Sequence, residues 1–516
     1  MRRSLLLPLM LWPVLTSSAQ EPGTVDVRLF GAEGQDEATA VWADGHGILL
    51  AGETTSDIVM AEGQAVWAPG GPMGLKGFVT AFDTALNWSW SFAFVGSPDA
   101  PLEAPSTLAV RDVVRSPSDS ATAWVLYDAP VEGQWQSTLM GVHPEDGILA
   151  RHSWSTGGVI TSTALVATES GFIWVGNEAP TAVPGGNGGI RLGFWEGQTE
   201  SSPTLAWLDG AEGHIPVAAD WHADTLYIAA HGPDPVAPAT ILMVAVVSGN
   251  PTLVGTAPIA DPDLAIVGLN AGPQGVAWSG TLQSPDGSLD AVYGRLNASA
   301  DPADPSLWGQ SWIQETVSGS DRPARALQWM GDVVQCAART TEAGAGGSGI
   351  LVQTRFGETG AWFGQFAFGG TGEEDLHAMA LDHEGRLLLA GSSNSWTELG
   401  PDNGSLDAAL FRISTPQLQN GFETTAVQAV LPEAAFVGFG TPDHHTTSST
   451  PAVTLRLGDR WPFAPESRWA IFDAAGRLSA SGLGGHWACT GAEGWRIVLE
   501  SDGHGYTLRR RLWVAP

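Results

Sequence analysis

Short apolar segments, each of about four to six residues, alternate along the chain with turns rich in glycine and proline. The segments fall into groups of four, and one group recurs about every 45–60 residues. In the first group the expected strands are residues 39–42, 48–51, 77–82 and 88–93. Short strands at this spacing predict an all-β protein built from four-stranded repeats.

Seven such groups follow one another between residues 24 and 419, and the first resembles the last. The expected second strands of the seven groups are residues 48–51, 123–126, 172–175, 226–229, 276–278, 333–336 and 387–390. The residues shared by the two end groups are Phe30, Gly31, Asp44, Gly47 and Gly52 in the first and Phe368, Gly369, Asp382, Gly385 and Gly391 in the last. A chain that ends in the unit with which it began is typical of a closed ring of repeats.

The seventh group lacks a fourth strand of its own. Residues 25–30 have the place that residues 362–368 occupy in the sixth group, so they can supply the missing strand. Pairing the first strand with the last group would close the ring and cover the edges that the two ends would otherwise leave open. We therefore predict a seven-bladed β-propeller over residues 24–419, closed by its N-terminal strand. A β-helix would have shorter and more regular coils, and tandem sandwiches would leave the similarity of the two ends without a cause.

Composition and charge narrow the class of protein. The 516 residues are 43% apolar, which is enough for several buried cores, and the formal net charge is −32. Residues 432–516 hold eight acidic residues and eight arginines, so the excess acid lies entirely before them. So negative a chain is a poor partner for nucleic acid or an anionic membrane surface.

The N-terminus has the parts of a secretory signal peptide over residues 1–19. Arg2 and Arg3 precede an apolar stretch, and Ala19 ends a run of small residues suited to cleavage. The apolar stretch is too short to span a bilayer, and no later segment is long enough. Export is therefore expected, with the mature protein secreted or displayed on an outer-membrane surface. Cys336 and Cys489 fall in different expected domains, which favours two buried thiols over a disulfide.

The two end groups resemble the repeats of exported bacterial β-propeller proteins of the SBBP type. That pattern reads Y/F-G-G-x-G-x-D-x-A, followed by V-D-x-x-G and a G-x-T turn, and the residues shared by the two end groups fit it. The resemblance implies structural roles: glycines at turns that need positive φ, and aspartates that cap the tight turn between the first two strands. It implies no catalytic residues.

From residue 420 to residue 516 the pattern changes to about seven short strands, which predicts a small C-terminal β-sandwich. This segment resembles the C-terminal sorting domain of type IX secretion in Bacteroidota, which has a D-x-x-G-R turn, a G-x-Y strand and a closing basic strand. The residues that carry the resemblance are Asp473, Gly476, Arg477, Gly494, Trp495, Arg509, Arg510 and Arg511. Trp495 and Arg496 depart from the usual pattern. The resemblance implies the type IX secretion machinery as a partner.

No motif for a nucleophile, a metal site or a phosphate-binding loop is present, and no cofactor or metal is expected. The remaining indication is loop length, because residues 53–76 and 392–406 form the longest connections between second and third strands. Both loops should emerge on one rim, and they combine tryptophans with carboxylates and an amide, as sugar- or peptide-binding sites do. The candidate ligand-binding residues are Asp57, Glu62, Trp67, Asn394, Trp396 and Asp402.

The resulting hypothesis is an exported β-propeller without catalysis that binds a glycan or peptide and serves as a binding or adhesion protein. The alternative is a secreted, glycan-directed hydrolase with carboxylates at the mouth of the propeller channel. A purely structural matrix protein is a third possibility.

Overall fold

The computed structural model describes most of the propeller region and the strands of the C-terminal region. The described residues are 24–31, 34–56, 58–61, 64–67, 75–96, 108–117, 119–131, 134–154, 159–169, 171–179, 188–196, 203–232, 238–247, 249–259, 264–272, 275–283, 289–297, 310–315, 322–323, 327–330, 333–340, 348–356, 360, 362–370, 372–395, 406–414 and the strands between 453 and 515. All regular secondary structure in them is β. The chain divides into two compact units, Met1–Val430 and Leu431–Pro516.

The first unit holds seven antiparallel sheets, one for each blade, and each strand is hydrogen-bonded to the next strand of its blade. Blade one is β2 (Asp36–Asp44), β3 (Gly47–Thr54), β6 (Lys76–Phe82) and β7 (Trp88–Phe94). Blade two is β8 (Ala109–Arg115), β9 (Ala123–Val131), β10 (Gln134–His143) and β11 (Gly147–Trp154). Blade three is β12 (Val159–Ala167), β13 (Gly171–Ala179), β14 (Gly189–Glu196) and β15 (Thr204–Glu212). Blade four is β16 (Ile215–His222), β17 (Thr225–His231), β18 (Thr240–Val247) and β19 (Asn250–Pro258).

Blades five to seven continue the same order. Blade five is β20 (Leu264–Gly272), β21 (Gly275–Gln283), β22 (Leu289–Asn297) and β23 (Gln310–Glu315). Blade six has β24 (Arg322–Pro323) and β25 (Gln328–Met330) on one side of β26 (Val333–Thr340), followed by β27 (Gly349–Phe356) and β28 (Trp362–Phe368). Blade seven is β29 (Glu374–Leu381), β30 (Leu387–Ser393), β31 (Asp407–Ser414) and β1 (Thr24–Gly31).

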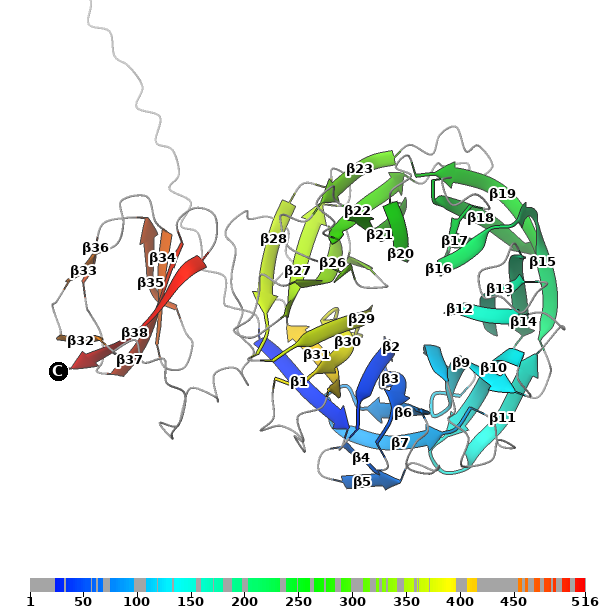
Figure 1. The fold of residues 1–516 in the computed structure, drawn as a ribbon, viewed down its shortest axis with the longest axis horizontal. Helices are drawn as coiled ribbons and strands as arrows, with labels where there is room; N and C mark the ends of the chain where they lie inside the picture. Colours follow the sequence, from blue (N-terminus) through cyan, green and yellow to red (C-terminus); the bar gives the residue numbers. More distant parts are fainter. Residues whose placement is uncertain are drawn as a thin grey trace, which may run out of the picture. The chain divides into compact units, whose positions relative to one another are not determined.

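The seven sheets stand around a common centre as a seven-bladed β-propeller (Figure 1). Each predicted second strand is the second strand of a blade, so the prediction of the fold is confirmed. β1 pairs with β31 from Thr24 opposite Ser414 to Phe30 opposite Ala408. The predicted closure by the N-terminal strand is confirmed as well.

One part of the closure is absent from the sequence-based prediction. The long connection of blade one contains a hairpin of β4 (Ile58–Ala61) and β5 (Gln64–Trp67). β4 pairs with the free side of β1, where Phe30 lies opposite Ala61. The sheet of blade seven therefore has six strands in the order β29-β30-β31-β1-β4-β5, and blade one supplies the last two.

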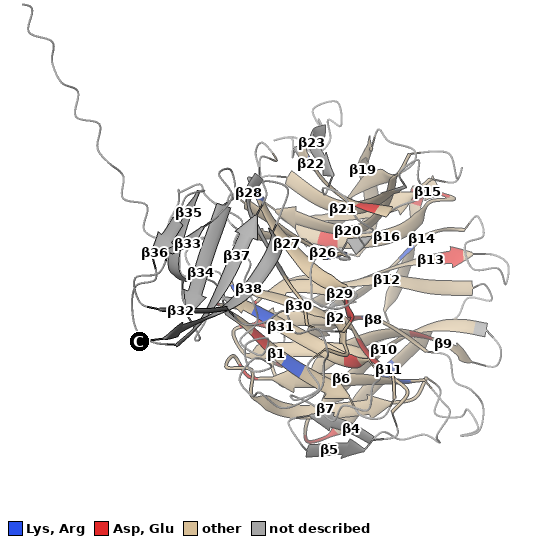
Figure 2. Cartoon of the chain, turned by 60° about the vertical axis from the view of Figure 1, so that its left-hand side comes forward, with Lys and Arg blue, Asp and Glu red and all other residues tan. Residues whose placement is uncertain are grey.

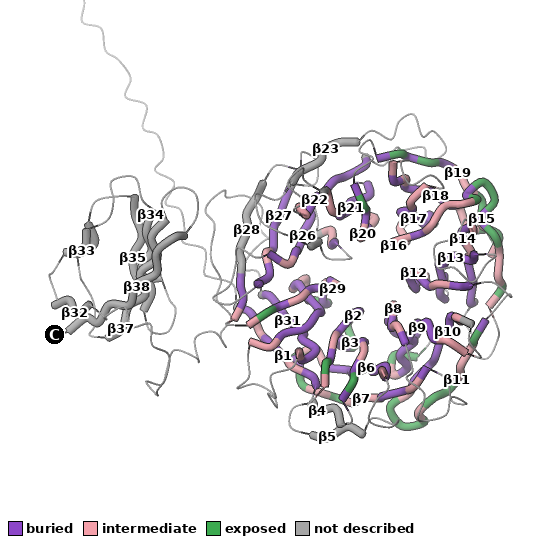
Figure 3. The backbone as a smooth tube through the Cα atoms, viewed as in Figure 1, coloured by how far each residue is buried: buried purple, intermediate pink, exposed green. Residues whose placement is uncertain are grey.

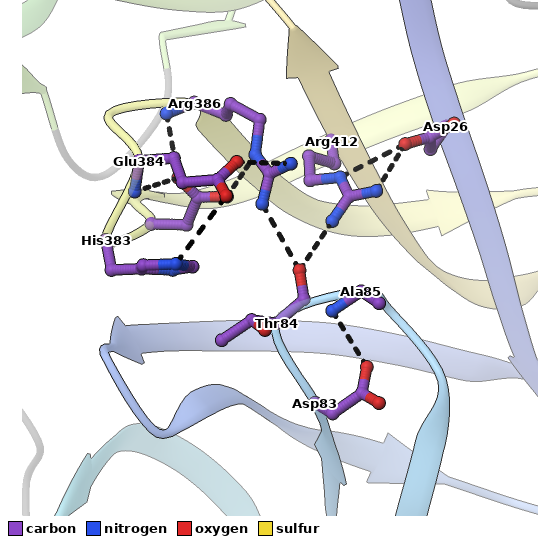
Figure 4. A network of polar contacts seen from close by, with 9 residues as sticks. Asp26, Asp83, Thr84, Ala85, His383, Glu384, Arg386 and Arg412 are labelled. Carbon is purple, nitrogen blue, oxygen red and sulfur yellow. Dashed lines mark hydrogen bonds and ion pairs between the residues drawn. The ribbon is translucent and has the colours of Figure 1, made fainter.

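Polar side chains join blade seven to blade one around the carbonyl oxygen of Thr84, in the turn between β6 and β7 (Figure 4). Arg412 donates to this oxygen over 2.9 Å and Arg386 over 3.2 Å. Arg412 also forms an ion pair of 2.6 Å with Asp26, its cross-strand partner on β1. We call Asp26, Thr84, Arg386 and Arg412 the closure network.

The cores lie between the blades. Branched and aromatic residues of the middle strands are buried, and the described residues with high exposure gather on the outer strands β11, β15 and β19 (Figure 3). Exposed and buried positions alternate at the end of β19, whereas the second strands are almost entirely buried, because neighbouring blades cover both of their faces. The thiol of Cys336 is free and buried in blade six, and Cys489 lies outside the described residues.

Basic residues are few in the propeller, and two of them, Arg28 and Arg412, lie on the closing pair β1 and β31 (Figure 2). Lys76, the only lysine of the chain, is buried and donates from Nζ to the carbonyl oxygen of Ser56 over 2.9 Å. Among the described residues no helix is long and apolar enough to cross a membrane.

The second unit contains a five-stranded sheet in the order β32-β38-β37-β34-β35 and a two-stranded sheet of β33 and β36. These strands are β32 (Val453–Arg456), β33 (Arg460–Pro462), β34 (Arg468–Asp473), β35 (Leu478–Leu483), β36 (His486–Ala488), β37 (Gly494–Ser501) and β38 (Tyr506–Ala515). The sandwich itself and the boundary at residue 420 stay predictions.

Candidate functional site

The innermost strands of six blades share a β-bulge near their first third. At each bulge the pairing register shifts, so one residue has no partner on the second strand. A bulge of this kind bends the strand and redirects the unpaired side chain. The six bulge residues are Thr39, Arg111, Thr163, Val217, Val267 and His377.

The bulges explain two of the glycines that the end repeats share. Gly52 lies opposite Ala38 and Gly391 opposite Leu376, in each case beside the residue that precedes the bulge. A Cβ atom on Gly52 would collide with the carbonyl oxygen of Glu37, and one on Gly391 with the carbonyl oxygen of Asp375. The glycines therefore permit a close backbone approach.

All six bulge residues line one cavity of about 810 Å³ that is enclosed by the innermost strands of the blades. Gln328 on β25 completes the ring from blade six. We call this cavity the central channel. Its other polar lining residues are Asp112, Thr161, Ser162, Asp220, Trp221, His231 and Asn270, together with Trp42.

Several bulge residues connect neighbouring blades at one level of the channel. The hydroxyl of Thr39 donates to the carbonyl oxygen of Val110 over 3.1 Å, and that of Thr163 donates to the carbonyl oxygen of Pro216 over 3.0 Å. Each acceptor directly precedes the bulge residue of the next blade. These bonds satisfy carbonyl groups that a bulge would otherwise leave unpaired, so the ring is part of the scaffold as well as the channel wall.

Arg111 is the one lysine or arginine among the described residues that line the channel. Its Nε donates to Asp128 over 2.9 Å, and the Asp128 side chain is fully buried. Asp128 also accepts bonds from the hydroxyl of Ser137 and the backbone N–H of Ser162. This acid is thus fixed by donors from blades two and three, and it fixes the arginine in turn.

Two carboxyl groups of the channel wall have raised pKa values. Burial raises the pKa of Asp112 to about 7, opposed by hydrogen bonds from the N–H groups of Leu165 and Val113, and the charge of Asp220 adds to the rise. Burial likewise raises the pKa of Asp220 to about 6. Asp220 accepts three hydrogen bonds, including those of Asn270 and the Ala271 N–H in blade five. Each acid therefore joins two blades.

The predicted rim residues are only partly described. Trp67 ends β5, opposite Ile58. Asn394 lies after β30, where its side-chain oxygen accepts the N–H of Glu373 over 2.6 Å. Its counterpart in blade one, Thr55, accepts the N–H of Gln35 in the same way, which is a turn-forming role. The remaining four, Asp57, Glu62, Trp396 and Asp402, lie outside the described residues, so ligand binding by this set stays a prediction.

The sorting-motif residues lie mostly in strands of the second unit. Asp473 ends β34 opposite Arg496, and Trp495 on β37 lies opposite Trp513. Gly494 begins β37, and Arg509, Arg510 and Arg511 lie in β38. Gly476 and Arg477 lie outside the described residues. In the described part of the chain, no group of three His, Cys, Asp or Glu residues is placed to hold a metal ion.

The capping roles implied by the repeat resemblance are confirmed. Asp44 accepts the N–H of His46 over 2.8 Å, and Asp382 accepts the N–H groups of Glu384 and Arg386 over 3.0 and 2.8 Å. Gly47 and Gly385 have φ values of 136° and 75°, which favour glycine.

Sequence reasoning missed the bulge ring, although a signal for it was present. Thr39 follows Phe30 by nine residues, and His377 follows Phe368 by nine residues. Aligning the end repeats therefore superimposes two channel-facing positions. The repeat sequences of the other blades are too different to be aligned with the end repeats, so the corresponding residue of blade two, Arg111, could not be recognised in this way.

Comparison with known proteins adds little beyond the fold. No protein-family model matches the sequence, and no curated protein matches it. Similar solved structures include a protein assigned as a 6-phosphogluconolactonase from Bacteroides fragilis, with 9% identity over 67% of this chain and 94% of that one, at a TM-score of 0.39. Prolyl oligopeptidase B from Galerina marginata matches 69% of this chain and 48% of its own, with 11% identity and a TM-score of 0.39. Sqt1 from Chaetomium thermophilum matches 77% and 99%, with 8% identity and a TM-score of 0.42. At these values the neighbours carry no argument about activity.

Proposed function

We propose that the protein is an exported, non-catalytic β-propeller that binds a small polar ligand in its central channel. The observation that supports this is a cavity of about 810 Å³ whose wall combines many apolar residues with a few fixed polar ones. Binding sites for small molecules have this composition and size. The ring of bulges directs one side chain from each of six blades toward the same space.

Blocking the channel tests the proposal. Val267 is a half-buried bulge residue of the channel, and Val247 is 70% exposed in blade four. Val267→Trp places a bulky side chain in the channel, and Val247→Trp is the matched control, the same substitution at an exposed position of blade four. We expect ligands found by calorimetric screening of sugars, sugar acids and short peptides to lose affinity in Val267→Trp and to keep it in Val247→Trp. A screen whose hits bind both variants equally would reject the channel as the binding site.

The rim loops are the second part of the proposal, as the face through which ligands approach. Binding that survives Trp67→Ala combined with Trp396→Ala would remove the rim from the site while leaving the channel in place. Both loops belong to the pair of blades that the hairpin β4–β5 connects.

Export and surface display by type IX secretion are proposed from the N-terminal and C-terminal patterns, and the SBBP resemblance agrees with an exported repeat protein. Mass spectrometry of the secreted chain should give an N-terminus near residue 20. Replacing Arg509, Arg510 and Arg511 with glutamine should retain the protein inside the cell envelope. Secretion of that variant at the normal level would contradict sorting by this strand.

One observation favours a hydrolase as a second candidate. Asp112 and Asp220 line the same cavity, and their pKa values of about 7 and 6 suit general acid–base catalysis near neutral pH. Against this, both carboxyl groups already accept hydrogen bonds from backbone N–H groups. Turnover of glycosides by the wild type, abolished in Asp112→Asn and Asp220→Asn, would establish the hydrolase; its absence over the ligands that bind would support the binding protein.

A further inference from the structure

The guanidinium group of Arg111 is only partly used by the protein. Its Nε is bonded to Asp128, whereas Nη1 and Nη2 have no partner among the described residues. The side chain is 30% exposed and lines the central channel. The group that faces the channel is therefore a fixed cation with free N–H donors.

The surroundings of Asp128 hold this cation in place. Asp128 accepts the Ser137 hydroxyl over 2.8 Å and the Ser162 N–H over 3.1 and 3.0 Å, and its side chain is buried. The hydroxyl of Ser162 accepts a bond from Nε1 of Trp174 in turn. A guanidinium group that is already oriented loses little further conformational entropy when it binds a planar anion. A flexible lysine side chain would lose more.

The chain as a whole is acidic, with a net charge of −32, but the acidic residues of the channel wall oppose the binding of an anion only weakly. The carboxyl oxygens of Asp112 and Asp220 accept backbone N–H bonds, so they are not offered to a cation. Burial raises the pKa of both acids, which lowers their negative charge near neutral pH. Burial lowers the pKa of His231, which favours the neutral form of this imidazole. Nε2 of His377 lies 2.6 Å from Oε1 of Glu37, so the Glu37 carboxylate already has a partner.

We infer that Arg111 is the anchor for a carboxylate group of a small ligand in the central channel, held by paired N–H···O bonds from Nη1 and Nη2. This inference rests on the proposed function and names the ligand class for the same cavity. Paired bonds of this kind are the geometry in which arginine recognises carboxylates. The hydroxyl oxygens of Thr39 and Thr163 lie on the same ring and can accept bonds from a hydroxylated body.

Titration calorimetry on the full chain with D-glucuronate and D-glucose tests the inference, because the two probes differ by one carboxylate. We expect glucuronate to bind the wild type more tightly than glucose, and less tightly as NaCl is added. Arg111→Gln should weaken glucuronate on the order of 10- to 100-fold, and Arg111→Lys by less, because lysine keeps the charge and loses the paired bonds. Arg191→Gln is the matched control, since Arg191 lies over the ring of Trp207, outside the channel lining.

The possible results separate the inference from the proposed function. Glucuronate affinity that is unchanged in both Arg111 variants, with normal thermal unfolding, would overturn the inference. Equal binding of glucose and glucuronate that Val267→Trp abolishes would also overturn it while supporting the channel as a site. If neither probe, nor any member of the wider screen, binds in a way that Val267→Trp reduces, the proposed function fails as well.

Discussion

The junction between blades two and three and the junction between blades seven and one join neighbouring sheets by different means. The first is built from tryptophan. Trp174 is fully buried, and its ring lies 5.0 Å from that of Trp154, which lies 5.5 Å from Trp195. Its charged pair, Arg111 with Asp128, lies at the channel side. The second has an apolar core of smaller residues, with the closure network beside it.

The difference follows from how the chain reaches each junction. Blades two and three are consecutive, so covalent connection keeps them close even before they pack. Blade seven itself is completed by the two ends of the propeller: Asp26 and Arg412 are 386 residues apart, and joining them costs the entropy of closing the whole ring. The β1–β31 ladder and the hydrogen bonds of the closure network fix one register for β1. Between blades two and three the short covalent connection already limits how the sheets can meet, so packing of large aromatic side chains is enough to hold them together. The comparison predicts different responses to the same kind of damage.

Removing β1 should have the largest effect. Deletion of residues 1–31 leaves β31 as an open edge and removes the partner of Arg412, so we expect loss of cooperative unfolding and aggregation. Circular dichroism during heating, with light scattering, measures both. Deletion of residues 1–23 is the control and should unfold like the full chain. A cooperative transition in the longer deletion at the same temperature would show that the ring does not depend on its closure.

Trp174→Ala should destabilise the junction of blades two and three by about 3–5 kcal/mol, because it leaves a large cavity and removes the donor to Ser162. Chemical denaturation monitored by fluorescence measures the loss. Trp207→Ala is the matched control, since Trp207 is 46% exposed on an outer strand, and it should cost under about 1 kcal/mol. Equal losses in the two variants would contradict a stabilising role for the aromatic cluster.

The two junctions should respond to pH in opposite directions. The pKa of Asp112, which joins blade two to blade three, is raised from 3.8 to about 7, chiefly by burial. The folded state therefore binds the proton more tightly than the unfolded state, and stability falls as pH rises from about 4 to about 7. The pKa of Asp83, in the turn that carries Thr84, is lowered, chiefly by the side-chain hydrogen bond from Asn87. Its contribution is present above pH 3.8 and is lost as pH falls through the lower folded value.

Unfolding free energies between pH 3 and pH 8 test this contrast. In the wild type the free energy of unfolding should fall by about 1–2 kcal/mol toward high pH because of Asp112, and this fall should be absent in Asp112→Asn. The effect is kept small because solvent reaches this half-buried carboxyl group and screens its charge. Asp83→Asn should flatten only the acid side. The pKa of Glu374 is also raised to about 7, but Glu374 is present in both the wild type and Asp112→Asn. The difference between the stability curves of these two proteins therefore reports on Asp112 alone. Parallel curves for the wild type and Asp112→Asn would refute the assignment.

The smallest expected effect is the coupling within the closure network. A double-mutant cycle of Asp26→Ala and Arg412→Ala should give about 1 kcal/mol, because the pair is partly exposed. The corresponding cycle for Arg111 and Asp128, where the acid is fully buried, should give more. A larger coupling for Asp26 and Arg412 than for Arg111 and Asp128 would reverse the comparison.

The fold was predictable because its signals are local and repeated. Apolar second strands such as residues 48–51 and 387–390 recur, and their likeness at the two ends identified the ring and its closing strand. The hairpin β4–β5 was not predictable, since its strands are four residues long and lie in a connection rich in glycine and proline, without alternation.

The candidate site was less predictable than the fold. The sequence drew attention to tryptophans and acids in long loops, where exposure and function often coincide. Arg111 is one of two arginines in a seven-residue strand, and its role in the channel depends on a bulge, on Asp128 seventeen positions later and on a serine in the next blade. No local pattern contains those three facts. The position that faces the channel can be recognised in the sequence only in the two end repeats, where Thr39 and His377 occupy it.

The hairpin from blade one gives β1 a neighbour on each side, so the closing strand is an interior member of its sheet. Withdrawing it means shearing its ladder to β31 and also freeing Phe30 and Gly31 from β4. Under tension applied at the N-terminus, blade one would resist the opening of blade seven. A ring sealed by its own end is thereby reinforced at the seal by a hairpin of the blade that comes next along the chain.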